Sequence, residues 1–215
     1  MPATGEQTAA TFSEMVKAAS WDAHEHAEQS RFMQELLAGN LPIERYADLV
    51  AQQLFAYRVI EEASLVQAGD PTGTRFVVPE LYRLSALEQD LTALLGPDWS
   101  ERIAPTPATQ EYCDRLRAVC FDWPGGYVAH HYVRYMGDLS GGQVIRRVVE
   151  RHYGIDRDTG TAFYAFDAVG DLKEFKARYR ELLDSQPWPS EERERIVDEV
   201  LIAYRLNSEV LDSLG

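Results

Sequence analysis

Cysteine is scarce in this sequence, which contains 2 cysteines, Cys113 and Cys120, among its 215 residues. They stand seven positions apart in a segment that we expect to be helical, which separates them by roughly 10 Å along the helix axis. At that separation they cannot form a disulfide with each other. A chain without a disulfide framework fits a reducing, cytoplasmic setting.

Long hydrophobic runs are also missing. No apolar stretch approaches the roughly 18 residues that a membrane-spanning helix needs. The N-terminus does not resemble a signal peptide, and the chain stops at Gly215 without a hydrophobic tail. We therefore expect no membrane association.

Basic residues are outnumbered by acidic ones. The chain has 21 Lys and Arg against 35 Asp and Glu, a net charge of −14 at pH 7, and its pI is about 4.7. Binding to nucleic acid or to an anionic membrane surface requires clustered cations. This balance argues against both as the main partner.

The residues that are present predict a globular, all-α protein. Of the residues, 45% are hydrophobic and 26% are charged, and the length suits one domain with one core. Apolar residues recur at steps of three and four, and no strand-like alternation stands out. We predict a disordered N-terminus over residues 1–10 and a single domain of seven to nine helices over 11–215. The expected helices cover residues 12–29, a short segment ending at 39–40, 42–68, 79–95, 107–121, 127–154 after a turn at 124–126, a segment from 172 onward and 190–213, with irregular structure over 155–169.

The segment from Tyr127 to Arg147 has helical apolar spacing but contains three glycines, at 137, 141 and 142. A glycine inside a helix costs about 1 kcal/mol relative to alanine, so three within six residues need a reason. Gly137 and Gly141 share a helical face and would leave a bare strip on which a flat ligand can lie. Close helix packing, or a kink in the helix, is the alternative explanation.

The same segment resembles the distal-helix signature of the haem oxygenase family, Ala-His-x-Tyr-x-Arg-Tyr-x-Gly-Asp-Leu-Ser-Gly-Gly. Ala129 through Gly142 match this pattern throughout. Tyr127 departs from it, because the family usually has leucine there, at the start of the helix. The resemblance implies that haem lies between an N-terminal proximal helix and this glycine-kinked distal helix, with Gly137, Gly141 and Gly142 facing the macrocycle.

The N-terminal helix contains a candidate metal ligand. Lys17, His24 and Glu28 have the spacing i, i+7 and i+11, which places them on one side of a continuous helix. A lone helical histidine is more often a packing or surface residue than a ligand. Glu28, one turn after His24, can accept a hydrogen bond from one ring nitrogen and leave the other for a metal. The run from Ala23 to Glu28 resembles the family's proximal helix, in which His24 takes the position of the haem iron ligand and His26 lies on another face.

Four further residues match the family's distal polar network. Asn207 is a polar residue on the apolar stripe of the last helix, so it must find hydrogen-bond partners. Tyr57 lies in the core stripe of its helix. By pattern alone, a core tyrosine whose hydroxyl has a buried partner is as good an explanation as a role in the network. The resemblance groups both with Arg134 and Asp138, and implies that Asp138 acts in catalysis through an ordered water.

Cations recur at helical spacing after residue 172, at Lys173, Lys176 and Arg180. A solvated helix face is the simple explanation of such a row. In the family, the positions of Lys176 and Arg180 pair with the haem propionates, and Lys17 and Tyr132 are expected to join them.

The function that the resemblance implies is oxidative cleavage of haem b at a meso carbon, with haem as both cofactor and substrate. It would consume O2 and electrons from an external redox partner of reductase, ferredoxin or flavodoxin type, and would release biliverdin, CO and iron. We expect a monomer that serves iron acquisition or bilin supply. A non-catalytic haem-binding or haem-transfer protein is the alternative, although it has no need of the distal polar set. A di-iron enzyme requires Glu-x-x-His pairs, and the sequence contains none.

Overall fold

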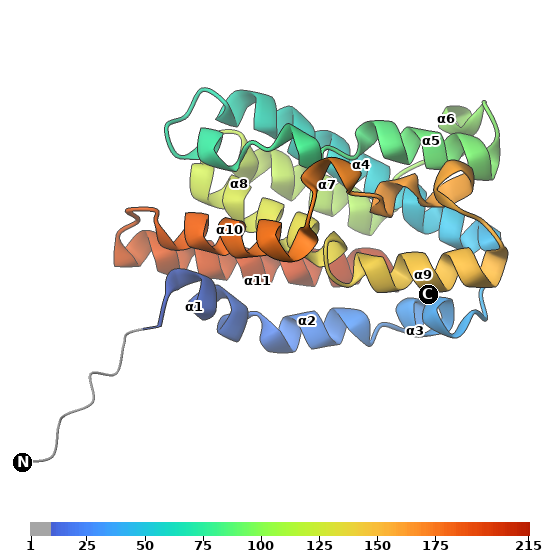
Figure 1. Ribbon diagram of the computed structural model, residues 1–215, viewed down its shortest axis with the longest axis horizontal. Helices are drawn as coiled ribbons and strands as arrows, with labels where there is room; N and C mark the ends of the chain where they lie inside the picture. The colour runs from blue at the N-terminus through green and yellow to red at the C-terminus, as the bar shows by residue number, and fades with distance from the viewer. Residues whose placement is uncertain (1–9) are drawn as a thin grey trace, which may run out of the picture.

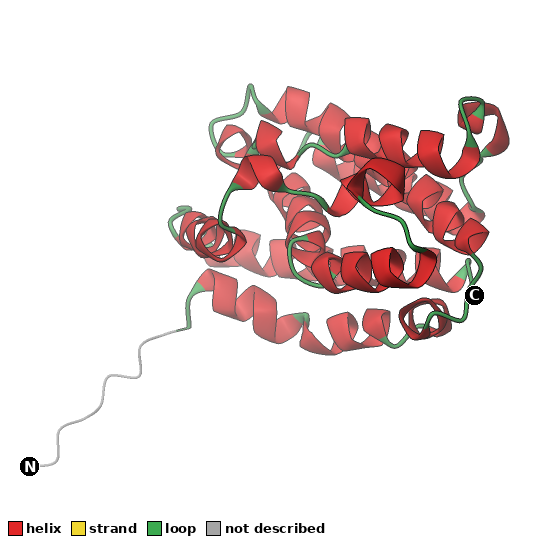
Figure 2. Ribbon diagram, turned by 45° about the vertical axis from the view of Figure 1, so that its right-hand side comes forward, coloured by secondary structure: helices red, strands yellow, loops and turns green. Residues whose placement is uncertain are grey.

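The computed structural model describes residues 10–215, except for the side chain of Glu28. All regular structure in this part of the chain is helical (Figure 2), as the sequence predicts. The expected disordered N-terminus falls almost entirely outside the described residues.

Eleven α-helices form the described part of the chain, more than the seven to nine that the sequence suggested. They are α1 (Phe12–Ala19), α2 (Trp21–Glu28), α3 (Arg31–Ala38), α4 (Ile43–Gln67), α5 (Leu84–Leu95), α6 (Trp99–Arg102), α7 (Pro107–Cys120), α8 (Pro124–His131), α9 (Gly142–Tyr153), α10 (Leu172–Asp184) and α11 (Ser190–Asp212). Short helical turns complete the chain: η1 (Gly73–Phe76), η2 (Pro79–Leu81), η3 (Tyr132–Met136), η4 (Arg157–Thr161), η5 (Ala162–Tyr164) and η6 (Asp167–Val169). Residues 155–169, expected to be irregular, thus consist largely of such turns.

The expected first helix is two helices, because the chain breaks at Ser20. Thr11 and Glu14 form the capping box that starts α1, as their spacing predicts. The Ser20 hydroxyl then donates to the carbonyl of Val16 at 2.8 Å. A serine that bonds back onto the preceding turn competes with the regular helical pattern and often bends the helix.

The expected central helix is also interrupted. It begins as α8, widens into the π-helical turn η3, and turns at residues 139–141 before α9 begins. Single π-helical turns are rare in proteins overall. Those that occur are often found at functional sites, because the wider turn redirects the side chains that follow it.

The long helices α4 and α11 organise the packing. α4 packs against α5, α7 and α8, whereas α11 packs against α1, α2, α7 and α8. In Figure 1 the helices α1 to α3 run along one side of the molecule, and α9, α10 and α11 lie between them and the helices α4, α5, α7 and α8. The N-terminal helices thus meet the rest of the molecule where α2 packs on α11 and α3 packs on α9.

Cys113 and Cys120 are both buried and free. None of the helices between residues 10 and 215 combines the length and the apolar character needed to cross a bilayer.

Candidate functional site: a cavity between α2 and the distal segment

A cavity of about 520 Å³ lies between the proximal helices and the distal segment. Its volume is within the range of about 300–1,000 Å³ that is usual for small-molecule sites. The lining is mostly apolar, with few polar groups. It consists of His24, Ala27, Gln29, Met33, Leu37, Leu49, Gln53, Val133, Arg134, Gly137, Asp138, Gly141, Gly142, Val144, Ile145, Tyr164, Tyr204, Asn207 and Leu211.

His24 provides an imidazole to the proximal wall. Its ring stacks on that of Trp21 at 6.3 Å and meets that of Tyr204 edge-on at 6.0 Å. These contacts fix the orientation of the ring where α2 packs on α11. His26 is exposed and is not among the cavity residues. The structure thus brings His24 to the site, as the sequence predicted, and not His26.

The prediction that Lys17 shares a helical face with His24 is wrong. Lys17 belongs to α1, and the break at Ser20 separates it from the helix that carries His24. The spacing rule for a continuous helix therefore does not apply to Lys17. The prediction for the Glu28 side chain lies outside the described residues.

The three glycines of the distal segment have different surroundings. A Cβ added to Gly137 would meet no atom within 4 Å, so its backbone faces open space. A Cβ added to Gly142 would lie 2.9 Å from Cδ1 of Tyr164, which is closer than real contacts allow. Gly137 thus fits the ligand explanation and Gly142 fits the packing explanation, although all three glycines line the cavity.

The distal polar residues come together from three elements. Tyr57 of α4 donates its hydroxyl proton to the carboxylate of Asp138. Arg134 of η3 donates to the amide oxygen of Asn207 on α11. The Arg134 guanidinium also lies 5.0 Å from the ring centroid of Tyr57 and 5.8 Å from that of Tyr112. All four predicted members of the network therefore lie together, with Tyr112 as a fifth that the sequence analysis missed.

The electrostatics of Asp138 suit acid–base chemistry near neutral pH. Burial raises the pKa of the Asp138 carboxyl to about 6, although the Arg134 charge and the Tyr57 hydrogen bond oppose the rise. Two nitrogens of Arg134, Nε and Nη2, are buried and have no hydrogen-bond partner among the described residues. Because buried donors are rarely left unsatisfied, they point to a polar guest in the cavity.

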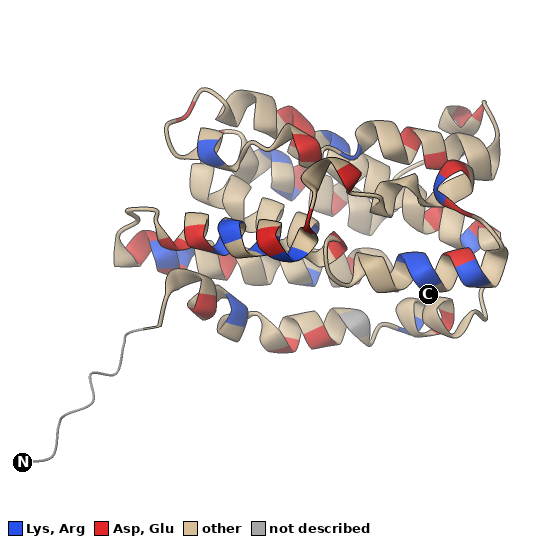
Figure 3. Ribbon diagram, in the orientation of Figure 1, with Lys and Arg blue, Asp and Glu red and all other residues tan. Residues whose placement is uncertain are grey.

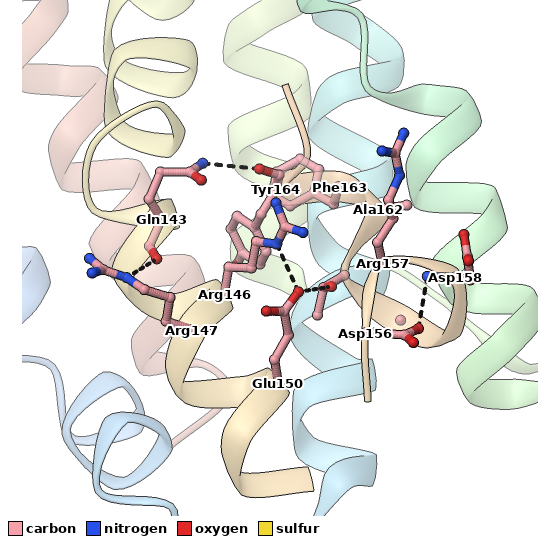
Figure 4. A network of polar contacts seen from close by, with 12 residues as sticks. Gln143, Arg146, Arg147, Glu150, Asp156, Arg157, Asp158, Ala162, Phe163 and Tyr164 are labelled. Carbon is pink, nitrogen blue, oxygen red and sulfur yellow. Dashed lines mark hydrogen bonds and ion pairs between the residues drawn. The ribbon is translucent and has the colours of Figure 1, made fainter. Parts of the chain in front are cut away.

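Tyr164 is a cavity residue that the sequence analysis did not single out. It belongs to η5, whose first two backbone N–H groups donate to the buried Asp90 carboxylate at 2.8 Å each. The carbonyl of Tyr164 accepts from Gln143 on α9 at 3.0 Å (Figure 4). These bonds hold the Tyr164 ring against Gly142. This contact could not be predicted from the sequence, because Gly142 and Tyr164 lie in different elements.

The expected propionate anchors lie outside the cavity lining. Lys17, Tyr132, Lys176 and Arg180 are all absent from the residues that border it. Lys176 instead donates to the Leu139 carbonyl at 3.3 Å and to the Ser140 hydroxyl at 3.1 Å.

The expected anchors nevertheless belong to elements that are close to one another. α1, which carries Lys17, packs against α10, which carries Lys176 and Arg180. The Arg180 charge opposes the rise that burial causes in the pKa of Tyr132. Lys176 and Arg180 are thus tied to the distal turn and to η3, at the margin of the site.

The arrangement suits a flat macrocycle that carries a metal. One imidazole borders the space on one side, and open glycine backbone borders it on the other. Apolar side chains such as Met33, Leu37 and Ile145 complete the walls. Val144 is 45% exposed and Leu37 is 36% exposed, which marks them as apolar rim residues that a bound ligand would cover. The described residues therefore fit haem.

Comparison with known proteins gives consistent matches. A family model described as "Heme oxygenase" matches residues 10–213. The chain is 36% identical over 193 residues to "Heme oxygenase" of Porphyra purpurea, across 90% of this chain and 82% of the relative. It is 35% identical over 195 residues to "Heme oxygenase 2" of a Synechocystis species, across 89% and 78% respectively.

Solved structures agree in fold. The crystal structure of heme oxygenase-1 from Synechocystis sp. PCC 6803 in complex with heme has a TM-score of 0.91 and 33% sequence identity, and covers 96% of this chain and 93% of that one. Heme oxygenase from Leptospira interrogans has a TM-score of 0.90 and 31% identity, and covers 95% and 100%.

Proposed function

This chain belongs to the heme oxygenase family, and on that premise we propose that it cleaves haem b at a meso carbon to biliverdin, CO and ferrous iron. The reaction takes O2 and electrons from an external donor. Haem is the substrate, and its iron also supplies the centre at which dioxygen is activated. The observation that carries the proposal is that His24 and Gly137 border the same cavity, with Asp138 beside the glycine.

His24 binds the substrate on the proximal side. Its imidazole would offer a ring nitrogen to iron, and the Trp21 and Tyr204 rings hold it in place. On the distal side, Gly137 brings backbone close to the macrocycle without a side chain. A site that splits an O–O bond as peroxidases do places an acid–base side chain over the iron, and the glycine withholds one.

Asp138 holds the proton donor at a distance. One carboxylate oxygen accepts from Tyr57, which leaves the other for a water in the cavity. Arg134 contributes positive charge, and its two unsatisfied nitrogens offer further bonds to water. A positioned water of this kind can deliver a proton to the reacting group.

Lys17, Tyr132, Lys176 and Arg180 bind the two propionates at the margin of the cavity. Charge-assisted hydrogen bonds between lysine or arginine and carboxylates are short and strong. The packing of α1 on α10 supports this role, since these two helices carry the three cations. Binding of haem would draw these flexible side chains toward the cavity.

The electron donor docks on the basic residues of α9 and α10. These two helices carry Arg146, Arg147, Arg151, Lys173, Lys176, Arg178 and Arg180 in a chain whose net charge is −14. In Figure 3 basic residues of both helices face the viewer, although acidic residues lie among them. An acidic ferredoxin, flavodoxin or reductase is the partner that this surface would attract.

One experiment separates this function from haem carriage. The purified protein is mixed with haemin, a reductant is added in air, and the absorbance is followed. Loss of the haem spectrum with formation of biliverdin is the expected result. A haem spectrum that persists unchanged would identify a carrier instead.

A further inference from the structure

A buried polar chain runs from the surface toward the distal site, through residues that the reaction as described does not use. Arg115 of α7 donates from Nε to Oε1 of Glu199 at 2.9 Å, and from a second nitrogen to Oε2. The same Oε1 lies 2.9 Å from Nε2 of His130. The other ring nitrogen of His130 lies 3.4 Å from the hydroxyl of Tyr112. His130, Tyr112 and Glu199 are at most 2% exposed.

The direction of each hydrogen bond follows from the charges. Burial raises the pKa of Glu199, but the hydrogen bonds from His130 and Arg115 outweigh it and bring the pKa to about 2. Burial lowers the pKa of His130, although Glu199 opposes this. An ionised carboxylate can only accept, so Nε2 of the neutral His130 carries the proton. Nδ1 is then an acceptor, and the Tyr112 hydroxyl must donate to it.

Tyr112 links this chain to Arg134. The guanidinium lies over the rings of both Tyr57 and Tyr112, 5.0 and 5.8 Å from their centroids. Among the described residues Arg134 forms no ion pair, and it donates a hydrogen bond to Asn207. Two aromatic faces therefore hold the cation in place. A phenol that donates its proton to an imidazole has a more electron-rich ring, which attracts a cation more strongly.

We propose that Glu199 is a positioning residue of the distal site, acting through His130 and Tyr112 on Arg134. The carboxylate fixes the His130 tautomer, the tautomer fixes the Tyr112 hydroxyl as a donor, and the Tyr112 ring holds the charge that faces Asp138. The catalytic consequence rests on the proposed function, whereas the arrangement belongs to the protein without haem. The alternative is that Glu199 has a purely structural role and only links α7, α8 and α11 through its hydrogen bonds.

The two accounts differ in the titration of Asp138, which carbon-13 NMR of the carboxyl group measures in the haem-free protein. Asp138→Asn assigns the signal. The charged and titratable groups that face Asp138 are Tyr57 from α4, Arg134 from η3, Arg83 ahead of α5 and Tyr164 from η5, and the variants below keep all four.

Glu199→Gln keeps the side-chain shape but allows the amide to donate to His130, so that Tyr112 need no longer donate. We expect the pKa of Asp138 to rise by about half a unit, because a less firmly held Arg134 stabilises the carboxylate less. A direct effect of removing a negative charge would lower that pKa, so the sign separates the two causes. Asp198→Asn removes the exposed neighbouring charge and should produce no rise.

Tyr112→Phe tests the same link from the other side. It keeps the ring and removes the donated proton, so it should also raise the pKa of Asp138, and the double variant should add little to either single one. An Asp138 pKa that stays at the parent's value, or falls, in folded Glu199→Gln would overturn the proposal. If that variant does not fold, an unchanged pKa in Tyr112→Phe would overturn it equally. A parent protein that makes no biliverdin would reject the proposed function and leave this coupling to be judged by the titration alone.

Discussion

The hydroxyl of Tyr57 donates a hydrogen bond to the carboxylate of Asp138 and so joins α4 to the distal segment. The two residues are far apart in the sequence, and the contact requires the middle of α4 to lie beside the residues that follow the π-helical turn η3. It gives Asp138 one fixed partner inside the protein. The second carboxylate oxygen stays available to the cavity that Asp138 lines.

Replacement of Asp138 tests its role in proton delivery. Asp138→Ala should bind haem nearly as well as the parent, because no proposed anchor is lost. Biliverdin formation should fall by about 100-fold or more, the usual contribution of a positioned acid–base group. Asp138→Asn can still hold a water and should keep partial activity. Haem titrations and initial rates measure the two effects, and an Asp138→Ala rate equal to the parent's would contradict the role.

Tyr57→Phe should change the pH dependence of the reaction. The pKa of Asp138 is about 6, and the Tyr57 hydrogen bond lowers it. Activity that needs the ionised carboxylate should therefore fall as the pH drops through about 6 in the parent. Without the hydrogen bond the pKa rises, so the midpoint should move to higher pH.

Tyr46→Phe is the matched control for that shift. Tyr46 lies on the same helix, and its hydroxyl donates to the carbonyl of Gly160 rather than to the distal site. Its pH profile should match the parent's. Identical midpoints for Tyr57→Phe and the parent would show that Asp138 does not govern the profile.

The sequence predicted the residues of the site better than the geometry that joins them. Arg134 and Asp138 stand in one recognisable motif, and Asn207 is conspicuous as a polar residue on an apolar stripe. The pattern could not show that Arg134 bonds to Asn207 while Tyr57 bonds to Asp138, because those contacts depend on the crossing of three helices. Tyr112 carried no signal of its own, since a core tyrosine is ordinary.

The predicted helix boundaries were wrong where a side chain competes with the backbone for hydrogen bonds. The capping box at Thr11 and Glu14 marked the start of α1 correctly, but the bond from Ser20 back to Val16 ended that helix early. Serine occurs inside many helices without breaking them, so spacing alone could not reveal the break. The reason for a glycine at position 142 lies in another element, because the ring of Tyr164 occupies the space that a Cβ would need.

Lys176 and Arg180 should control which meso carbon is cut. If they are the propionate anchors that we propose, their loss should free the haem to rotate in its plane more than it weakens haem affinity, which burial of apolar area largely supplies. The double variant Lys176→Ala, Arg180→Ala should yield a mixture of biliverdin isomers. Arg178→Ala, an exposed cation on the same helix whose nearest acid is Glu174 at 3.9 Å, should yield the parent's isomer. Chromatography of the products decides, and an unmixed parental isomer from the double variant would count against the anchors.

Charge reversal on α9 and α10 should slow electron delivery. Arg147→Glu and Lys173→Glu each place an acidic group on the proposed docking surface, so an acidic donor should reduce the haem complex more slowly. Salt should slow the parent in the same way, because it screens the encounter. Arg117→Glu, on α7, is the control. Stopped-flow rates that depend neither on ionic strength nor on these reversals would remove the docking surface.

We propose that haem binds in the cavity between α2 and the distal segment with His24 on its iron. Resonance Raman spectra of the ferrous haem complex report the iron–imidazole bond directly. We expect His24→Ala to lose this band and to regain activity in part when imidazole is added, whereas His26→Ala, which changes an exposed histidine two residues away, should retain the band. A band that persists in His24→Ala and disappears in His26→Ala would contradict it.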